Sequence, residues 1–189
     1  MNELIAAIQQ TLPAVAREWN TEKLPLFETL VEKPFAEYFA GKQTQEKTKM
    51  MSPILDIIFA RQVNAIIPEF VVDEGAGRDY SFRGTPMECK ITFGSGNSWS
   101  GNGYPKAPWH ILLRFDANEQ GVITHVFAML VDLDTCTTRW LPGSKATNKT
   151  VNWYHLTFLS EDLGKLSFAV GSMQQKRKFL QPSMILVDT

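Results

Sequence analysis

The sequence predicts an α+β fold, in which a central mixed β-sheet is flanked by helices, from three observations. Apolar residues recur at helical spacing in about residues 1–67, short β-type runs follow from about residue 68, and the two patterns do not alternate. Helices that precede a strand-rich remainder are typical of an α+β or mixed α/β sandwich and not of an alternating barrel. We therefore expect one domain over residues 1–189, with a sheet of about five or six strands.

The helical part contains two apolar segments. The first series recurs at helical spacing and consists of Leu4, Ile8, Leu12, Val15 and Trp19. Pro13 should interrupt this series, because proline removes a backbone donor. Ser52 followed by Pro53 is typical of a helix start, so residues 54–67 should form a central buried helix that Pro68 ends.

The later part contains short runs rich in β-branched and aromatic residues, separated by turn residues. The expected strands are residues 70–72, 80–82, 87–92, 109–115, 123–131, 137–141, 154–159, 166–170 and 184–187. Residues 94–108 should form a long loop without strands, which is usually a functional or a disordered segment.

Composition limits the class of protein. The 189 residues are 44% hydrophobic and 21% charged, which is ordinary for one globular domain. No apolar run reaches the roughly 18 residues that a membrane span needs, and the first residues do not resemble a secretion signal, so we expect a cytoplasmic protein without a membrane partner. Cys89 and Cys136 have no paired spacing and should be reduced. With 19 basic against 20 acidic residues, any surface for nucleic acid must be local.

Residues 78–92 form two alternating runs around Gly84, Thr85 and Pro86, which predicts a β-hairpin. Because side chains alternate along a strand, Glu88 and Lys90 should share one face, opposite the face of the apolar residues Met87, Cys89 and Ile91.

The hairpin register follows from the turn. Pro86 lacks an amide hydrogen, which favours a four-residue loop over 83–86, although a two-residue loop at Gly84 and Thr85 gives the same register. Asp79 then lies opposite Lys90 and diagonal to Glu88, with the β-carbons of the two acidic residues roughly 5 to 8 Å apart.

Two carboxylates at that spacing suit one hard cation. Asp79 and Glu88 could hold Mg²⁺, with the backbone carbonyl of Cys89 as a further oxygen ligand. The ion would polarise a phosphate and lower the pKa of a bound water, while Lys90 would position that water and stabilise developing negative charge.

Asp79 followed by Glu88-Cys89-Lys90 on a hairpin resembles the active site of the PD-(D/E)xK nuclease superfamily, particularly type II restriction endonucleases. The resemblance covers about 15 residues directly. It implies a restriction-endonuclease-like fold, in which a helix precedes a mixed sheet, the Asp opens the second strand and the Glu-x-Lys lies in the third. It also implies Mg²⁺-dependent hydrolysis of phosphodiester bonds at a specific double-stranded DNA sequence, with Asp79 and Glu88 as ligands and Lys90 as catalytic residue.

Further expectations follow from this resemblance. Some relatives use an acidic residue of the preceding helix, for which Asp56 is the candidate and Glu46 or Glu74 the substitutes. Because one site cuts one strand, double-strand cleavage predicts a homodimer, with the apolar N-terminal helices available as interface. No small-molecule cofactor is expected.

Two polar stretches are expected to face DNA. Their side chains can donate to base edges or phosphates, and the candidates are Asn97, Ser98, Asn102, Lys106, Lys145, Asn148 and Lys149. A flexible connector is the alternative for 94–108, and a solvated turn is the alternative for 142–152.

Three other interpretations remain open. Asp79, Arg83, Glu88 and Lys90 could form ordinary ion pairs on an exposed hairpin, each contributing little to stability. The same site could serve a repair, recombination or phage nuclease. From another class, a non-catalytic β-rich binding module would grip a protein or carbohydrate through the aromatic side chains of Trp99, Tyr104 and Trp109.

His110 is expected to be a hydrogen-bonded core histidine, although it could face the site.

Overall fold

A computed structural model describes residues 1–39, 43–73, 75, 78–93, 99–101, 107–142 and 154–168. The helices are α1 (Asn2–Glu18), α2 (Leu24–Phe27), α3 (Ala36–Phe39) and α4 (Gln43–Ile66), with the π-helical turns η1 (Trp19–Lys23) and η2 (Glu28–Glu32) and the 3-10 turns η3 (Leu133–Thr135) and η4 (Ser160–Lys165). The strands are β1 (Phe70–Val72), β2 (Tyr80–Phe82), β3 (Thr85–Phe93), β4 (Trp99–Gly101), β5 (Trp109–Ala117), β6 (Ile123–Asp132), β7 (Leu141–Pro142), β8 (Tyr154–Leu156) and β9 (Ser167–Phe168).

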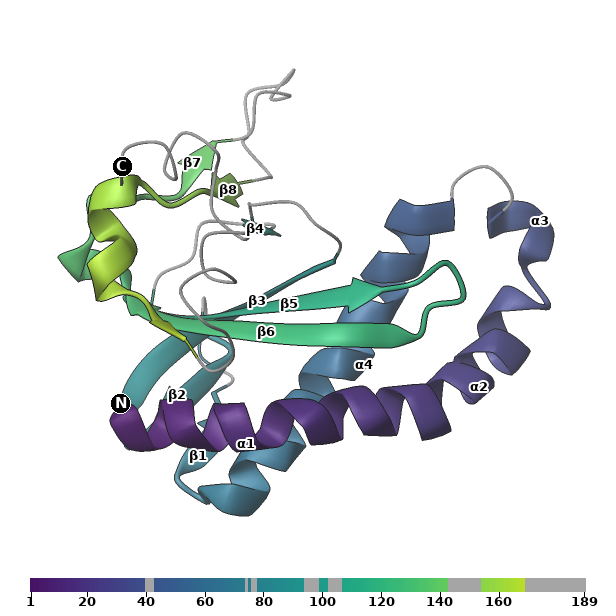
Figure 1. Ribbon diagram of the computed structural model, residues 1–189, viewed down its shortest axis with the longest axis horizontal. Coiled ribbons are helices and arrows are strands. Elements are labelled where there is room, and N and C mark those ends of the chain that lie inside the picture. The colour runs from purple at the N-terminus through teal and green to yellow at the C-terminus, as the bar shows by residue number, and fades with distance from the viewer. Residues whose placement is uncertain are drawn as a thin grey trace.

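The described elements form three layers, with a mixed six-stranded sheet in the middle (Figure 1). The strand order is β1-β2-β3-β5-β6-β9; β3 and β5 run parallel, and the other neighbours are antiparallel. Helices α1 and α4 cover one face, and the small sheet β4-β8-β7 lies over the other face. The predicted α+β class and central mixed sheet are confirmed.

Each face of the central sheet has its own core. Ile111 and Leu113 of β5 pack toward the helices, whereas Leu112 between them packs with Trp99 and Leu156 of the small sheet. Both faces of β5 are therefore buried, which explains its nearly continuous apolar sequence. The same alternation along β3 sends Met87 and Cys89 into the helix-side core.

The two long helices differ from the sequence expectations. Pro13 lies inside α1 and does not interrupt it, because the buried Leu12 and Val15 pack in one core on both sides of the proline. Helix α4 begins at Gln43, so Ser52 and Pro53 lie in its interior and do not start it. The buried Met51 extends the apolar face of α4 ahead of the proline.

Two strand predictions were also wrong. Trp99–Gly101 forms β4 inside the stretch expected to be a loop, because the buried Trp99 pairs with Leu156 of β8. Residues 137–140 do not form a strand, since the amides of Thr137 and Thr138 donate to the Asp162 carboxylate and not to a neighbouring strand. The predicted strand 184–187 lies outside the described residues.

The turn between β5 and β6 is tied to the end of α1. The Trp19 indole donates to the carbonyl of Gly121 at 2.9 Å. The Asn20 side-chain amide accepts from the amide of Ile123 and donates to its carbonyl, both at 2.8 Å, and so acts as a one-residue strand partner. These contacts fix the position of the turn relative to the helical layer.

None of the helices in the described ranges combines the length and the apolar character that crossing a membrane requires.

Asp162 anchors η4, and its removal should destabilise the fold. Its fully buried carboxylate accepts hydrogen bonds from Thr137, from the amide and hydroxyl of Thr138, and from Lys165. Burial opposes ionisation, but these hydrogen bonds outweigh it and lower the pKa of Asp162 to about 2. Asp162→Ala should cost about 3 kcal/mol in the free energy of unfolding, measured in urea at neutral pH.

The pH dependence of this cost has a defined sign. A lowered native pKa stabilises the protein fully above the unfolded pKa of about 4. The difference between wild type and Asp162→Ala should therefore shrink as the pH falls from about 4 toward 2. Exposed Glu161, in the same turn, provides the control Glu161→Ala. A constant difference across this range would contradict the assignment.

Candidate active site

The β2–β3 hairpin has a two-residue turn. Arg83 and Gly84 have φ of 49° and 77°, the positive values of a type I′ turn, and Phe82 pairs with Thr85. The predicted four-residue loop and its register are therefore wrong by two positions. Pro86 has no amide hydrogen, and none is needed at its position. It lies opposite Ser81, next to the closing pair Phe82–Thr85, where an antiparallel ladder makes no hydrogen bond. The pairing of β3 with β5 begins only at the next residue. An even shift leaves the faces unchanged, so the predicted alternation is confirmed.

The corrected register brings Asp79 next to the middle of β3. Tyr80 pairs with Met87, and the amide of Asp79, just beyond the end of β2, also donates to the carbonyl of Met87 at 3.0 Å. Its carboxylate accepts a hydrogen bond from the amide of Cys89 at 2.7 Å. The side chain of Asp79 therefore takes the place of a backbone partner at an edge of β3 that β2 no longer covers.

Lys90 joins the predicted site residues. Its ammonium forms ion pairs with the Glu88 carboxylate and with the Asp79 carboxylate, the latter at 3.6 Å. It also donates to the carbonyl of Cys89 at 3.1 Å. Lys90 thus contacts both acidic side chains.

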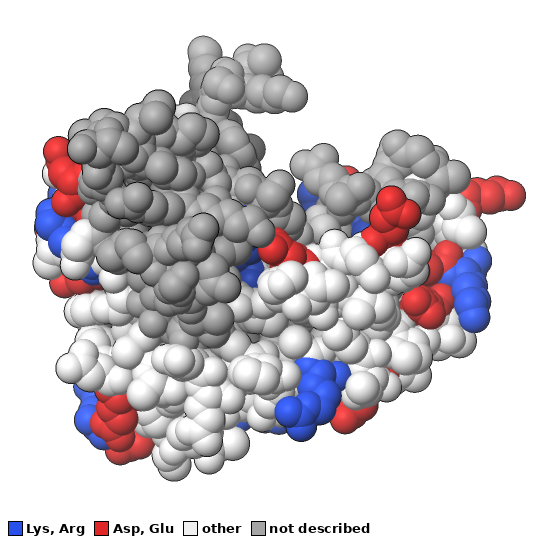
Figure 2. Space-filling model, in the orientation of Figure 1, with Lys and Arg blue, Asp and Glu red and all other residues white. Residues whose placement is uncertain are grey.

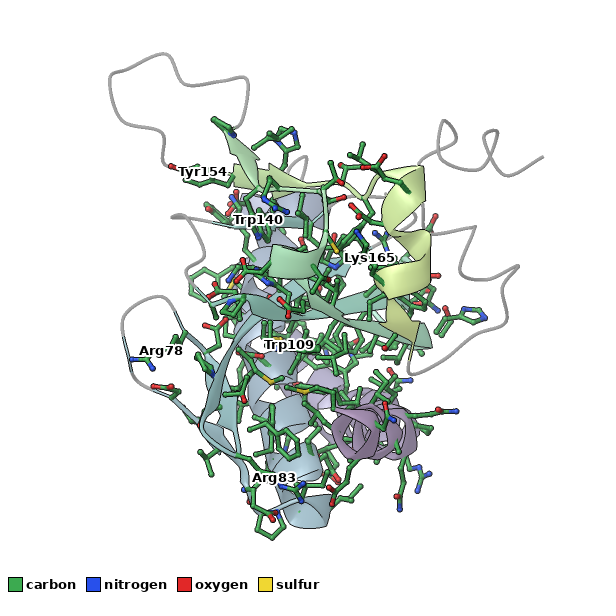
Figure 3. The ribbon with its side chains drawn as sticks, turned by 90° about the vertical axis from the view of Figure 1, so that its left-hand side faces the viewer. Arg78, Arg83, Trp109, Trp140, Tyr154 and Lys165 are labelled. Atoms are coloured by element: carbon green, nitrogen blue, oxygen red, sulfur yellow. The ribbon has the colours of Figure 1, made fainter. Side chains whose placement is uncertain are left out.

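These ion pairs are not those of an exposed hairpin. The side chain of Glu88 is 8% exposed and that of Lys90 is 16% exposed, whereas that of Asp79 is 36% exposed. Arg83 lies at the turn end of the hairpin (Figure 3) and pairs with Glu3 and Glu69. Of the four charged residues of the hairpin, only Arg83 therefore fits the interpretation of ordinary ion pairs on an exposed surface.

Burial and charge shift the pKa values in the site. Burial raises the pKa of Glu88, and the hydrogen bond and charge of Lys90 only partly oppose this. Burial would lower the pKa of Lys90, but the carboxylates of Asp79 and Glu88 outweigh it and raise the pKa. Lys90 is therefore a stable ammonium at neutral pH, suited to stabilising negative charge and not to accepting a proton.

The residues fit a hard cation in their chemistry. The Oε2 atom of Glu88 is buried and has no hydrogen-bond partner among the described residues. Two carboxylates and the Cys89 carbonyl at the strand edge offer oxygen ligands, the type that Mg²⁺ prefers. No group of three or more His, Cys, Asp and Glu side chains in the described part of the chain is arranged to hold a metal, so water would have to complete the coordination.

Asp56 lies on α4, beside Cys89 of β3. Its carboxylate accepts a hydrogen bond from the Tyr80 hydroxyl at 2.7 Å. Burial raises its pKa, and the charge of Asp79 raises it further. Its role as a third metal ligand stays a prediction. Of the substitutes, Glu46 pairs with Lys49 at 2.8 Å, and Glu74 lies outside the described residues.

His110 is the neighbour of Glu88 on β5 and is buried. Its Nε2 accepts from the Trp140 indole at 2.9 Å, so its Nδ1 carries the hydrogen that is donated to the Pro108 carbonyl at 3.1 Å. Burial lowers the pKa of His110 to about 4, which keeps the ring neutral. The expectation of a hydrogen-bonded core histidine is confirmed.

A cleft of about 1680 Å³ opens beside Lys90. Its floor is β3 from Cys89 to Phe93; one wall is α4 with α3, the other is β4, and the β5–β6 turn closes one end. Figure 2 shows the surface hollowed between the region of β4, β7 and β8 and the region of α3. Lys90 therefore faces a groove large enough for an extended ligand.

Gly101 of β4 is a site residue that the sequence analysis missed. A β-carbon on Gly101 would lie 2.9 Å from Cε and 3.3 Å from Cδ of Lys90. A glycine is needed here because β4 packs directly on the stem of Lys90. Residue spacing carries no signal for this contact, because the two strands meet only in the tertiary fold.

The predicted DNA contacts lie outside the described residues. They are Asn97, Ser98, Asn102, Lys106, Lys145, Asn148 and Lys149. For the alternative of a binding module, Trp99 is fully buried and donates to the carbonyl of Leu113, so it is not a surface contact. Trp109 is half-buried against the helix-side core (Figure 3).

Comparisons with family models, curated proteins and solved structures find no match for this chain. The site must therefore be judged by its own geometry.

Gly101→Ala should displace Lys90 without unfolding the protein. The added methyl group meets the flexible lysine stem, which can shift, so the cost in the free energy of unfolding should stay at about 1–3 kcal/mol, from the weakened pairing with the buried Glu88. Moving the ammonium away from Glu88 removes a contact that lowers its pKa, so Glu88 should titrate at higher pH in carbon-detected NMR.

The matched control is Gly164→Ala, because a β-carbon at Gly164 would meet no atom within 4 Å. An unchanged Glu88 titration in Gly101→Ala would show that β4 does not position Lys90.

Proposed function

We propose that this protein is a Mg²⁺-dependent endodeoxyribonuclease of the PD-(D/E)xK type, acting as a restriction endonuclease on a specific double-stranded DNA sequence in the cytoplasm. The observation that carries the proposal is the convergence of Asp79, Glu88 and Lys90 at the uncovered edge of β3. The order of elements supports it: α4 precedes the sheet, Asp79 directly precedes its second strand, and Glu88 and Lys90 lie in its third.

Each residue has a role that its surroundings support. Lys90, a permanent ammonium, would orient the attacking water and stabilise the charge that develops on the phosphate. Asp79 is held by the Cys89 amide, which fixes its carboxylate toward Lys90. The half-buried setting strengthens these electrostatic interactions, because little water screens them.

Asp79, Glu88 and the Cys89 carbonyl would hold Mg²⁺. When bound, the ion supplies Lewis acidity toward the phosphate and lowers the pKa of a coordinated water. The unpartnered Oε2 of Glu88 and the carbonyl of Cys89 are the atoms of this chain that support such a role.

Cleavage of plasmid or phage DNA tests the proposal directly. In Mg²⁺ the wild type should give discrete fragments, and without metal it should give none. Asp79→Asn, Glu88→Gln and Lys90→Met should each lower the cleavage rate by at least about 100-fold, since each removes charge that stabilises the transition state.

Arg83→Met is the matched control, because Arg83 lies on the same hairpin but forms ion pairs away from the site. It should retain the wild-type rate. Full activity in Glu88→Gln, or no cleavage by the wild type, would rule out the proposed function. Cutting only at DNA ends or junctions would favour a repair, recombination or phage nuclease.

The pH dependence of Mg²⁺ binding should depend on Lys90. Mg²⁺ needs Glu88 ionised, burial raises the pKa of Glu88, and Lys90 partly lowers it. In Lys90→Met that lowering is lost, so the acid limb of Mg²⁺ affinity, measured by calorimetry, should move to higher pH. A midpoint that stays the same or moves to lower pH would contradict this coupling. Arg83→Met should leave the midpoint unchanged.

Cleavage of both strands makes a homodimer part of the proposal. The apolar face of α1 is not available as its interface, because Leu4, Ile8 and Leu12 are buried in the chain's own core. In the N-terminal helical region, exposed apolar side chains lie on the segment from α2 to α3 and on α4, and include Leu26, Leu30, Phe35, Tyr38, Met50 and Ile57. Gel filtration that gives a monomer both free and on DNA would count against the dimer.

A further inference from the structure

One face of α4 carries a polar stripe along the cleft. Thr48, Ser52 and Asp56 follow one another at intervals of four residues, so they lie on the same side of the helix. All three line the cleft that contains Lys90. The stripe therefore runs from the candidate site along the wall of the groove.

The stripe contrasts with the rest of this helix. Met51 and Leu55, its neighbours in sequence, are buried in the helix-side core. Ser52 is half-buried, and its hydroxyl has no hydrogen-bond partner among the described residues. A hydroxyl in this position is not needed to complete the fold and is free to donate into the groove.

The nearby lysines are already engaged. Lys47 forms an ion pair with Glu32, and Lys49 forms one with Glu46 at 2.8 Å. On this wall, the Ser52 hydroxyl is therefore a donor that a ligand can use without breaking an ion pair.

From this arrangement we infer that Ser52 binds the phosphate next to the one that is cleaved, and that the bound strand follows α4 away from Lys90. This inference rests on the proposed function and names the part of the substrate that this wall contacts. Serine and threonine hydroxyls commonly position DNA through phosphate oxygens, without reading its sequence. Continuity with Lys90, in the same cleft, selects a phosphate backbone as the occupant.

Affinity for DNA measures the contact. The probe is a labelled duplex fragment of plasmid DNA that the wild type cleaves in Mg²⁺, and binding is measured in Ca²⁺ by fluorescence anisotropy. Ser52→Ala should weaken binding about tenfold, as expected for one hydrogen bond to a charged group. Ser52→Asp should weaken it about 100-fold, since it adds repulsion between like charges.

Ser167 provides matched controls, because it is exposed on β9 at the far edge of the sheet. Ser167→Ala and Ser167→Asp should bind within about twofold of the wild type. Ser52→Ala is favourable in a helix, so it remains a usable variant if Ser52→Asp does not fold.

Single neutral methylphosphonates in the cleaved strand identify the phosphate. The wild type should be sensitive at one position adjacent to the cleaved bond, and Ser52→Ala should lose that sensitivity, because the two changes remove the same contact. A merely structural role of Ser52 would weaken binding to every probe equally.

The outcomes separate the two proposals. If the wild type cleaves DNA and Ser52→Ala binds normally, or binds every probe equally weakly, the inference is wrong and the proposed function stands. If the wild type does not cleave DNA, the proposed function is wrong and the inference falls with it.

Discussion

The site depends on one hydrogen bond, between the Asp79 carboxylate and the amide of Cys89. Strand β2 covers only the first residues of β3, which leaves the backbone of Cys89 at an open edge. An unpaired amide there would be costly once it is shielded from water. The carboxylate satisfies it, and in doing so places a negative charge beside Lys90, which also pairs with Glu88.

The layered architecture supplies the environment that this arrangement needs. The helices cover one face of β3, and β4 of the small sheet packs on the other. Glu88 is therefore nearly buried, and Gly101 packs against Lys90. Charges in such a setting interact more strongly than charges on the surface, and a buried carboxylate is costly without a cation. The fold therefore keeps one lysine between two acids, beside an open groove.

Local pattern predicted the parts of the site that depend on strand alternation. The shared face of Glu88 and Lys90 follows from a period of two, which a register error of two positions does not change. Asp79 reaches this pair through its hydrogen bond to the Cys89 amide, beyond the end of β2. The prediction of the turn was wrong because Arg83 adopts a positive φ, which few non-glycine residues adopt. The extent of α4, the strand β4 and the contact of Gly101 with Lys90 depend on tertiary packing, which sequence spacing does not encode. Ser52 was hidden because it was interpreted as a helix start.

We propose that Asp79 and Glu88 together bind one divalent cation beside Lys90. Calorimetric titration of Mg²⁺ at neutral pH, in the absence of DNA, tests it most directly. One saturable site is expected in the wild type, lost in both Asp79→Asn and Glu88→Gln and kept in Arg83→Met. Mg²⁺ binding that survives either of the first two substitutions, or that is absent from the wild type, would contradict it.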